Sequence, residues 1–248
     1  MSRFNTYKKY IEYKQNYNDK NIDELCKKNN EFELQPQQLF LKKYFNKNIN
    51  NIKQFLLYHE IGSGKTCTSI ILAEEFLKIN NQNKILVILP ARLVNNYYDE
   101  LISLCTNFKY FDENDYELYI NNNTGFNIKQ KLRKKFIANI NLKYNILSYD
   151  KFRLLCMKNK NNILKFLNDF TKNTIVIIDE IHNIISNTYS IDDYLKIEEK
   201  GKLVKIDTLS LNSTLIKLLS KFSHNNCKII YLTATPIYDK IKESKEVL

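Results

Sequence analysis

The sequence predicts an α/β protein with a mainly parallel sheet and helices on both of its faces. Two continuous apolar runs, at 84–89 and 174–178, are typical of strands that are covered on both sides. Segments with helical patterns separate these runs, as the crossover connections of a parallel sheet require. A glycine-containing turn at 62–64, between a short apolar run and a helical pattern, predicts a strand–turn–helix unit that binds an anion.

In the first half of the chain, helical patterns alternate with short apolar runs. Leu39, Phe40, Tyr44 and Phe45 supply the apolar residues of the first helix, and Pro90 follows the second strand. The predicted elements are, in order, a helix at 35–46, a strand at 55–58, a helix at 66–79, a strand at 84–89 and a helix at 93–105.

The second half continues this alternation. The Asn-rich stretch 121–125 is a loop signal, the basic residues of 128–140 fit a solvated helix face, and polar residues 187–206 predict a surface insertion. The predicted elements are a weaker strand at 116–120, a helix at 128–140, a strand at 145–148, helices near 150–157 and 161–170, a strand at 174–178, a helix at 208–222 and a strand at 228–232.

Length and composition limit the possible classes of protein. The chain has 248 residues and a net charge of +11, from 38 Lys plus Arg and 27 Asp plus Glu. No internal repeat or Pro-rich linker divides it, so we expect one main domain, with residues 1–30 as a helical arm or a loosely ordered extension. The positive charge favours polyanions such as nucleic acid or an anionic membrane, although scattered Lys residues also serve general solubility.

Cysteine usage predicts a reducing compartment. The five cysteines are far apart and include no C-x-x-C pair or Cys/His cluster, so neither a disulfide framework nor a zinc site is indicated. The polar N-terminus and the absence of a long apolar stretch predict a soluble, intracellular protein. The cysteines are Cys26, Cys67, Cys105, Cys156 and Cys227.

The glycine turn has the residues of a phosphate-binding loop. Gly62 and Gly64, on either side of Ser63, let backbone N–H groups point towards an anion at a helix N-terminus. Lys65 is suited to bind β- and γ-phosphates, and the Thr66 hydroxyl is suited to bind Mg²⁺. His59 replaces the first Gly of the strict pattern, so an ordinary turn is the alternative.

Acidic residues at the end of the apolar run 174–178 form a second candidate site. Asp179 is suited to hold Mg²⁺ opposite Thr66, and Glu180 to orient and deprotonate an attacking water. A helix N-cap is the alternative for such an acidic pair. The phosphate-loop residues upstream favour catalysis.

Three motifs in this order resemble the first RecA-like domain of superfamily 2 helicases. They are Gly62 to Thr66, Asp179 to His182, and Thr233 to Thr235. The resemblance covers roughly residues 31–238 and implies that ATP and Mg²⁺ are the cofactors. It leans towards the nucleoside triphosphatases and transcription-factor helicases of poxviruses and other large DNA viruses, and for such a virus the protein would be cytoplasmic or in the virion.

The resemblance also implies roles for single residues. Gln38 matches the position that recognises adenine, and Pro90 and Arg92 match the first nucleic-acid-contacting motif. It implies that Thr233 and Thr235 couple hydrolysis to strand movement and that His182 couples the acidic motif to the Thr233 loop. A plain helix-cap histidine is the alternative for His182.

The expected protein is therefore the N-terminal motor domain of an ATP-dependent nucleic-acid translocase or helicase, a P-loop ATP hydrolase. Its ATP-binding domain would span 31–248 and act on DNA or RNA. The resemblance implies a second RecA-like domain or partner subunit that supplies an arginine, without which hydrolysis would be weak. A non-motor ATP-binding scaffold on nucleic acid and the motor subunit of a restriction enzyme are the alternatives.

Overall fold

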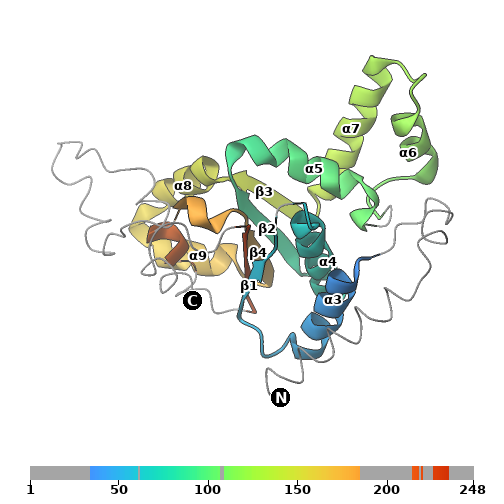
Figure 1. The fold of residues 1–248 in the computed structure, drawn as a ribbon. Coiled ribbons are helices and arrows are strands. Elements are labelled where there is room, and N and C mark those ends of the chain that lie inside the picture. Colours follow the sequence, from blue (N-terminus) through green and yellow to red (C-terminus); the bar gives the residue numbers. More distant parts are fainter. Residues whose placement is uncertain are drawn as a thin grey trace.

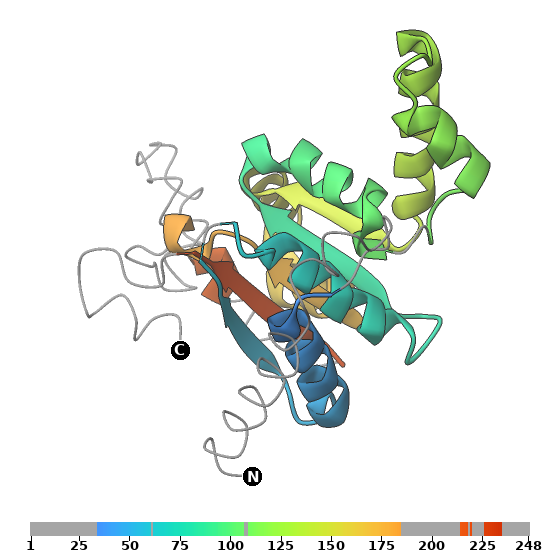
Figure 2. The same ribbon diagram turned by 45° about the vertical axis from the view of Figure 1, so that its right-hand side comes forward.

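The protein is built on a five-stranded parallel sheet with strand order β1-β5-β4-β2-β3 (Figures 1 and 2). The computed structural model describes residues 34–60, 62–106, 109–184, 214–217, 219 and 226–234. The strands are β1 (Gln54–Tyr58), β2 (Lys84–Leu89), β3 (Tyr144–Ser148), β4 (Thr174–Ile178) and β5 (Lys228–Thr233). This architecture confirms the predicted fold class.

Helices cover both faces of the sheet (Figure 1). Four of them, α3, α4, α5 and α7, contribute residues to the hydrophobic cluster on one face, and α8 and α9 contribute to the cluster on the other. The helices are α3 (Pro36–Asn48), α4 (Lys65–Leu77), α5 (Val94–Ile102), α6 (Glu113–Ile120), α7 (Phe126–Ile140), α8 (Tyr149–Lys158) and α9 (Ile163–Phe170). Short 3₁₀ turns are η1 (Ala91–Leu93), η2 (Leu104–Thr106), η3 (Lys160–Asn162) and η4 (Ile181–Ile184).

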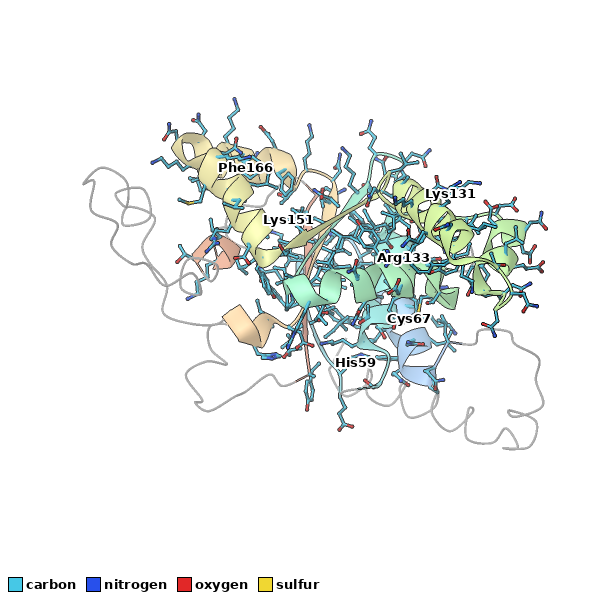
Figure 3. All side chains as sticks on the ribbon, turned by 90° about the horizontal axis from the view of Figure 1, so that it is seen from above. His59, Cys67, Lys131, Arg133, Lys151 and Phe166 are labelled. Carbon is cyan, nitrogen blue, oxygen red and sulfur yellow. A yellow bond between two sulfur atoms is a disulfide. The ribbon has the colours of Figure 1, made fainter. Side chains whose placement is uncertain are left out.

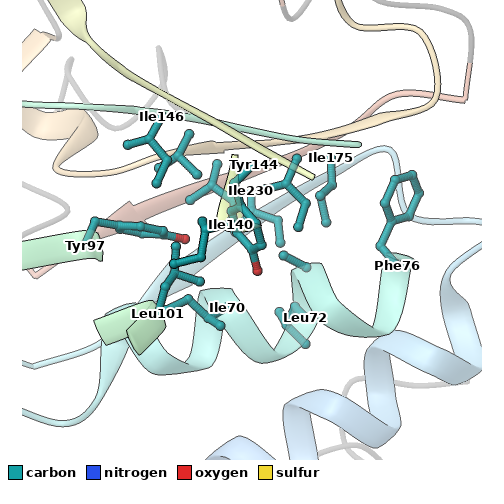
Figure 4. Packing of buried hydrophobic residues seen from close by; sticks show 14 of the residues in the cluster. Ile70, Leu72, Phe76, Tyr97, Leu101, Ile140, Tyr144, Ile146, Ile175 and Ile230 are labelled. Carbon is teal, nitrogen blue, oxygen red and sulfur yellow. The ribbon is translucent and has the colours of Figure 1, made fainter. Parts of the chain in front are cut away.

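Alternation along the central strands explains how the sheet joins the two clusters. In β4, Ile175 and Ile177 pack into the first cluster, whereas Val176 and Ile178 pack into the second. All four side chains are 0 % exposed, so the strand is buried on both faces. Figure 4 shows residues of the first cluster, among them Ile70 and Leu72 of α4.

The strand predicted at 116–120 is wrong, because this segment belongs to helix α6. Asp112 caps the helix by accepting a hydrogen bond from the Asn114 N–H at 2.9 Å. Tyr116 stacks on Phe111, and Tyr119 packs edge-on against Phe136 of α7. Helical i,i+3 spacing places both tyrosines on the side that meets α7. The α6–α7 pair projects from the body of the domain (Figures 1 and 2).

The helix predicted at 93–105 is divided into η1, α5 and η2. Ser103 has an extended backbone with ψ of −173°, which ends α5, and its hydroxyl donates to the Glu100 carbonyl oxygen at 2.6 Å. The division places Cys105 in the short turn η2.

Some expectations lie outside the described residues. These are the N-terminal arm at 1–30, the surface insertion at 187–206 and Thr235. Of the helix expected at 208–222, residues 214–217 and 219 are described and are helical. Within the described part of the chain, no helix has both the length and the apolar composition needed to cross a bilayer.

Candidate nucleotide site

Sheet topology brings the three sequence motifs to one edge of the protein. Strand β5 lies between β1 and β4, so the segments that follow these three parallel strands emerge side by side. The His59 N–H donates to the Thr233 carbonyl oxygen at 3.2 Å and extends the β1–β5 pairing past Tyr58. The phosphate-loop candidate and the Thr233 segment are therefore joined directly.

The glycine turn has the backbone geometry that the sequence predicts. Gly62 and Gly64 have φ of 81° and 79°, a left-handed conformation that other residues adopt at a cost. Helix α4 begins at the next residue, Lys65. The Ser63 hydroxyl donates to the Glu60 carbonyl oxygen at 2.7 Å and also lies 3.3 Å from Nδ1 of the buried His59.

A cavity of about 300 Å³ opens at this turn. Its walls come from the phosphate loop, the first turn of α4, the ends of β4 and β5, and α5. The lining residues are Glu60, Gly62, Gly64, Lys65, Thr66, Cys67, Glu100, Glu180 and Ala234.

The two acidic residues after β4 meet the lysine of the loop. Lys65 Nζ lies 3.1 Å from Asp179 Oδ1 and forms an ion pair with Glu180. Asp179 is 4 % exposed, and burial raises the pKa of its carboxyl group although the Lys65 charge opposes that rise. Glu180 has a φ of 55°, and its N–H donates to Asp179 Oδ1 at 2.9 Å. A positive φ at a residue with a Cβ is strained, and such strain is frequent at functional sites.

His182 connects the acidic pair to β5. Its Nδ1 lies 2.9 Å from Thr233 Oγ1 and 3.2 Å from Glu180 Oε2. Burial lowers the pKa of His182, so the ring is neutral near pH 7. The geometry joins the acidic residues to the Thr233 segment, while a role in coupling stays a prediction.

Gln38 is buried against the phosphate loop. Its Oε1 accepts from the Gln35 N–H at 2.9 Å, which caps α3, and its Nε2 lies 3.5 Å from the Gly64 carbonyl oxygen. A Cβ at Gly64 would lie 2.8 Å from this Nε2, so any other residue there would displace the end of the Gln38 side chain. Recognition of adenine by Gln38 stays a prediction.

The nucleic-acid candidates lie at the end of β2 and do not line the cavity. Pro90 is half-buried and precedes η1, and Arg92 of η1 is exposed. Their suggested contact with nucleic acid stays a prediction.

Sequence reasoning missed several residues of the cavity wall. Cys67 directly follows the phosphate-loop motif, so its position in the sequence could have indicated it. Glu100 gave no signal, because its place at the cavity depends on how α5 packs. The cysteine spacing indicated no disulfide framework, and it gave no sign that Cys67 and Cys105 are bonded to each other.

Comparison with known proteins identifies the family. The family described as "Type III restriction enzyme, res subunit" matches residues 15–238, and the chain belongs to it. Protein R563 of Acanthamoeba polyphaga mimivirus, provisionally named an ATP-dependent RNA helicase, is 34 % identical over 95 % of this chain and 35 % of its own length.

Two further relatives come from other viruses. Protein 087L of Invertebrate iridescent virus 3, provisionally named a helicase, is 28 % identical over 76 % of this chain and 17 % of its own length. The early transcription factor 70 kDa subunit of Melanoplus sanguinipes entomopoxvirus is 26 % identical over 86 % of this chain and 24 % of its own length. The chain thus spans about a third or less of the length of these relatives. These matches confirm the resemblance to helicases of large DNA viruses.

Proposed function

We propose that this chain is the ATP-binding motor domain of a nucleic-acid helicase or translocase. The observation that carries the proposal is the meeting of Lys65, Glu180 and the Thr233 segment around one cavity at the carboxyl edge of a parallel sheet. Family membership and the names of the relatives support ATP as the nucleotide and DNA or RNA as the polymer.

The donor groups at the cavity suit a magnesium-bound triphosphate. The N-terminus of α4 and the turn at Gly62 and Gly64 provide backbone N–H groups for phosphate oxygens. Thr66 lines the cavity and Asp179 contacts the lining residue Lys65, and their oxygen atoms are the hard ligands that Mg²⁺ prefers. Bound there, Mg²⁺ would offset the negative charge of the phosphates.

Each charged side chain then has a separate task. On nucleotide binding, Lys65 exchanges its carboxylate partners for phosphate oxygens. This exchange frees Glu180 to orient a water molecule and to accept its proton. The neutral His182 holds Glu180 and Thr233 in one hydrogen-bonded group, through which the state of the phosphate reaches β5. Arg92, exposed beyond β2, contacts the nucleic-acid backbone.

A facing domain or partner subunit completes the motor in this proposal. An arginine supplied from outside the cavity typically raises phosphoryl-transfer rates by ~10³–10⁵. The relatives with transcription and RNA-helicase names favour a role in the nucleic-acid metabolism of a large DNA virus.

The test measures Mg·ATP binding and hydrolysis by the chain, with and without DNA and RNA homopolymers, beside Lys65→Ala. We expect the wild-type chain to bind Mg·ATP and to hydrolyse it slowly, and we expect Lys65→Ala to lose this binding. Nucleotide binding with no turnover, even after a facing domain is supplied, would favour the non-motor scaffold. Wild-type protein that does not bind Mg·ATP would refute the assignment altogether.

The description of the matching family favours one further candidate, the motor subunit of a restriction enzyme. That function requires a nuclease elsewhere in the full assembly and DNA as the only polymer. ATP-dependent cleavage of DNA by the assembly would support it, and stimulation by RNA alone would exclude it.

A further inference from the structure

A disulfide connects the wall of the nucleotide cavity to the end of α5. Cys67 Sγ and Cys105 Sγ are covalently bonded; their Cα atoms are 5.6 Å apart, and the two residues are 38 positions apart in the sequence. Cys67 lies in the first turn of α4, next to Thr66, and lines the cavity (Figure 3). Cys105 lies in η2, which packs against α4.

The other described cysteines have a different environment. Cys156 and Cys227 form no disulfide and are buried in the hydrophobic cluster on the opposite face of the sheet. Burial raises the pKa of the Cys156 thiol to about 12, which makes this thiol a poor nucleophile at neutral pH. The bonded pair differs because Cys105 is only half-buried and lies beside the cavity-lining Glu100.

We propose that Cys67 and Cys105 form a reversible redox pair that sets the affinity of the cavity for Mg·nucleotide. This proposal rests on the function proposed above. The exchange partner is a small-molecule thiol–disulfide couple such as glutathione.

The chemistry is thiol–disulfide exchange. During oxidation, the Cys105 thiolate attacks a small-molecule disulfide, and a mixed disulfide forms at Cys105 as one small thiolate leaves. The Cys67 thiolate then attacks Cys105 Sγ and expels the second small thiolate. Two electrons pass from the protein to the small disulfide, and the two protons lost by the cysteines end on the small thiolates. Reduction follows the same steps in reverse. A small thiolate first attacks the sulfur of Cys105, the less buried residue of the pair.

The bond acts on the part of the chain that would hold phosphate. It ties the first turn of α4, where backbone N–H groups face the cavity, to η2 and hence to α5. In this bonded form, the glycine turn already has its left-handed conformation and the cavity is open. A binding site held in its binding conformation loses less conformational freedom when the ligand arrives, so the oxidised form should bind nucleotide more tightly.

Glu100 gives the pair a second connection to the cavity. This residue lines the cavity, and its Oε2 lies 3.6 Å from Cys105 Sγ. A disulfide sulfur carries no proton, so this contact becomes an S–H···O hydrogen bond only when Cys105 is reduced. Reduction therefore releases the first turn of α4 and gives Glu100 a new donor at the same time.

The first experiment measures the bond without nucleotide. The full chain is prepared with Cys26→Ser, which removes a thiol outside the described residues. This protein is equilibrated in a series of glutathione buffers of different redox potential, and its free thiols are then alkylated. Peptide mass spectrometry should find Cys67 and Cys105 converting together, with Cys156 and Cys227 reduced throughout. If Cys67 and Cys105 stayed as free thiols at every redox potential, the proposal would be overturned.

The second experiment measures the affinity of both forms for a fluorescent Mg·ATP analogue. We expect the oxidised form to bind on the order of fivefold more tightly, and by reciprocity Mg·ATP should shift the disulfide equilibrium by the same factor. Cys105→Ser, which lies outside the cavity wall, should match the reduced protein under both conditions, and Cys156→Ala should respond like the parent protein.

The outcomes separate the two proposals. Equal affinity of the oxidised and reduced forms would overturn the redox proposal and leave the nucleotide site standing. Binding by neither form would overturn the nucleotide site, and the regulation with it. Weaker binding by the oxidised form would also overturn the direction proposed here.

Discussion

Two buried carboxyl groups near the two ends of helix α4 have opposite surroundings. Glu74, in the last turns of the helix, is 8 % exposed and accepts hydrogen bonds from Tyr110 Oη at 2.6 Å and Tyr144 Oη at 2.7 Å, with Lys109 as an ion-pair partner. Asp179, beside the first residue of the helix, is 4 % exposed, and its carboxyl group pairs with Lys65 and accepts a hydrogen bond from the Glu180 N–H.

The difference lies in what the partners can do. The tyrosines of the Glu74 cluster are fixed, because Tyr144 belongs to β3 and packs edge-on against Tyr110. This cluster ties α4 to β3 and to the segment before α6. Lys65, by contrast, is a flexible side chain on the wall of a cavity, and a phosphate can replace the carboxylates around it. We infer that Glu74 stabilises the fold and that the Asp179–Glu180 pair is kept available for chemistry.

Substitution of Glu180 should give the largest effect. Glu180→Gln keeps the shape of the side chain but cannot accept a proton, so turnover should fall by about 10²–10⁴. Nucleotide affinity and the free energy of unfolding should change little. Steady-state hydrolysis and analogue binding measure both quantities, with Glu100→Gln, at another carboxyl group of the cavity wall, as a matched control that retains most turnover. Normal turnover in Glu180→Gln would contradict its assignment as the base.

Glu74 should show the opposite pattern. Glu74→Leu leaves two buried tyrosine hydroxyls without their acceptor, so unfolding free energy should fall by about 2–4 kcal/mol. Nucleotide affinity should remain close to that of the wild type at temperatures where the variant is folded. Urea unfolding measures the change, and Glu75→Gln, on the adjacent residue with more exposed partners, is the control. Loss of nucleotide binding by folded Glu74→Leu would break the distinction between the two acids.

Substitution of Gln38 distinguishes two possible roles of its buried amide, which are recognition of adenine and packing against Gly64. If it recognises adenine, Gln38→Ala should weaken ATP binding by about 1–3 kcal/mol and GTP binding much less. If its packing against Gly64 is what matters, both nucleotides should lose affinity equally. Competition binding with ATP and GTP distinguishes these results, and equal losses would refute adenine recognition.

The central part of this comparison could be predicted from the sequence. Continuous apolar runs reveal β2 and β4 because both faces of these strands are covered, and the residues after β4 are then placed at a binding edge. The glycine turn is also a local signal, since Gly62 and Gly64 are required by their positive φ. The sequence therefore indicated the meeting of Lys65 with the acidic pair.

Features that depend on packing between distant segments could not be predicted. The Glu74 cluster needs Tyr110 and Tyr144, which are 36 and 70 positions away in the sequence. The bond between Cys67 and Cys105 depends on where α5 ends and how η2 meets α4. Helix α6 was mistaken for a strand because its tyrosines are frequent in strands, whereas contacts with α7 favour the helix.

The smallest expected effect concerns Glu75, a half-buried carboxylate whose pKa moves in the opposite direction from that of Asp179. Partial burial alone would raise the pKa of Glu75, but hydrogen bonds from Lys78 and Asn46 and the charge of Lys42 lower it below its ordinary value. A carboxyl group with a lowered pKa stabilises the fold above its unfolded-state pKa, and this contribution is lost as pH falls. Asp179 has a raised pKa, so ionising it costs stability, and that cost disappears as pH falls.

Glu75→Gln should therefore lower the free energy of unfolding by less than about 1 kcal/mol at pH 7, because the Lys78 partner is largely exposed and screened by salt. The difference from the wild type should shrink as pH falls below 4.5, the ordinary pKa of the group. Urea unfolding of both proteins at pH 7 and pH 4, in low and high salt, measures it. Asp99→Asn, whose carboxylate is 55 % exposed beside Arg133, provides a surface control. A difference that grows as pH falls would show that Glu75 behaves like Asp179, and that the hydrogen bonds and charges around Glu75 do not outweigh its burial.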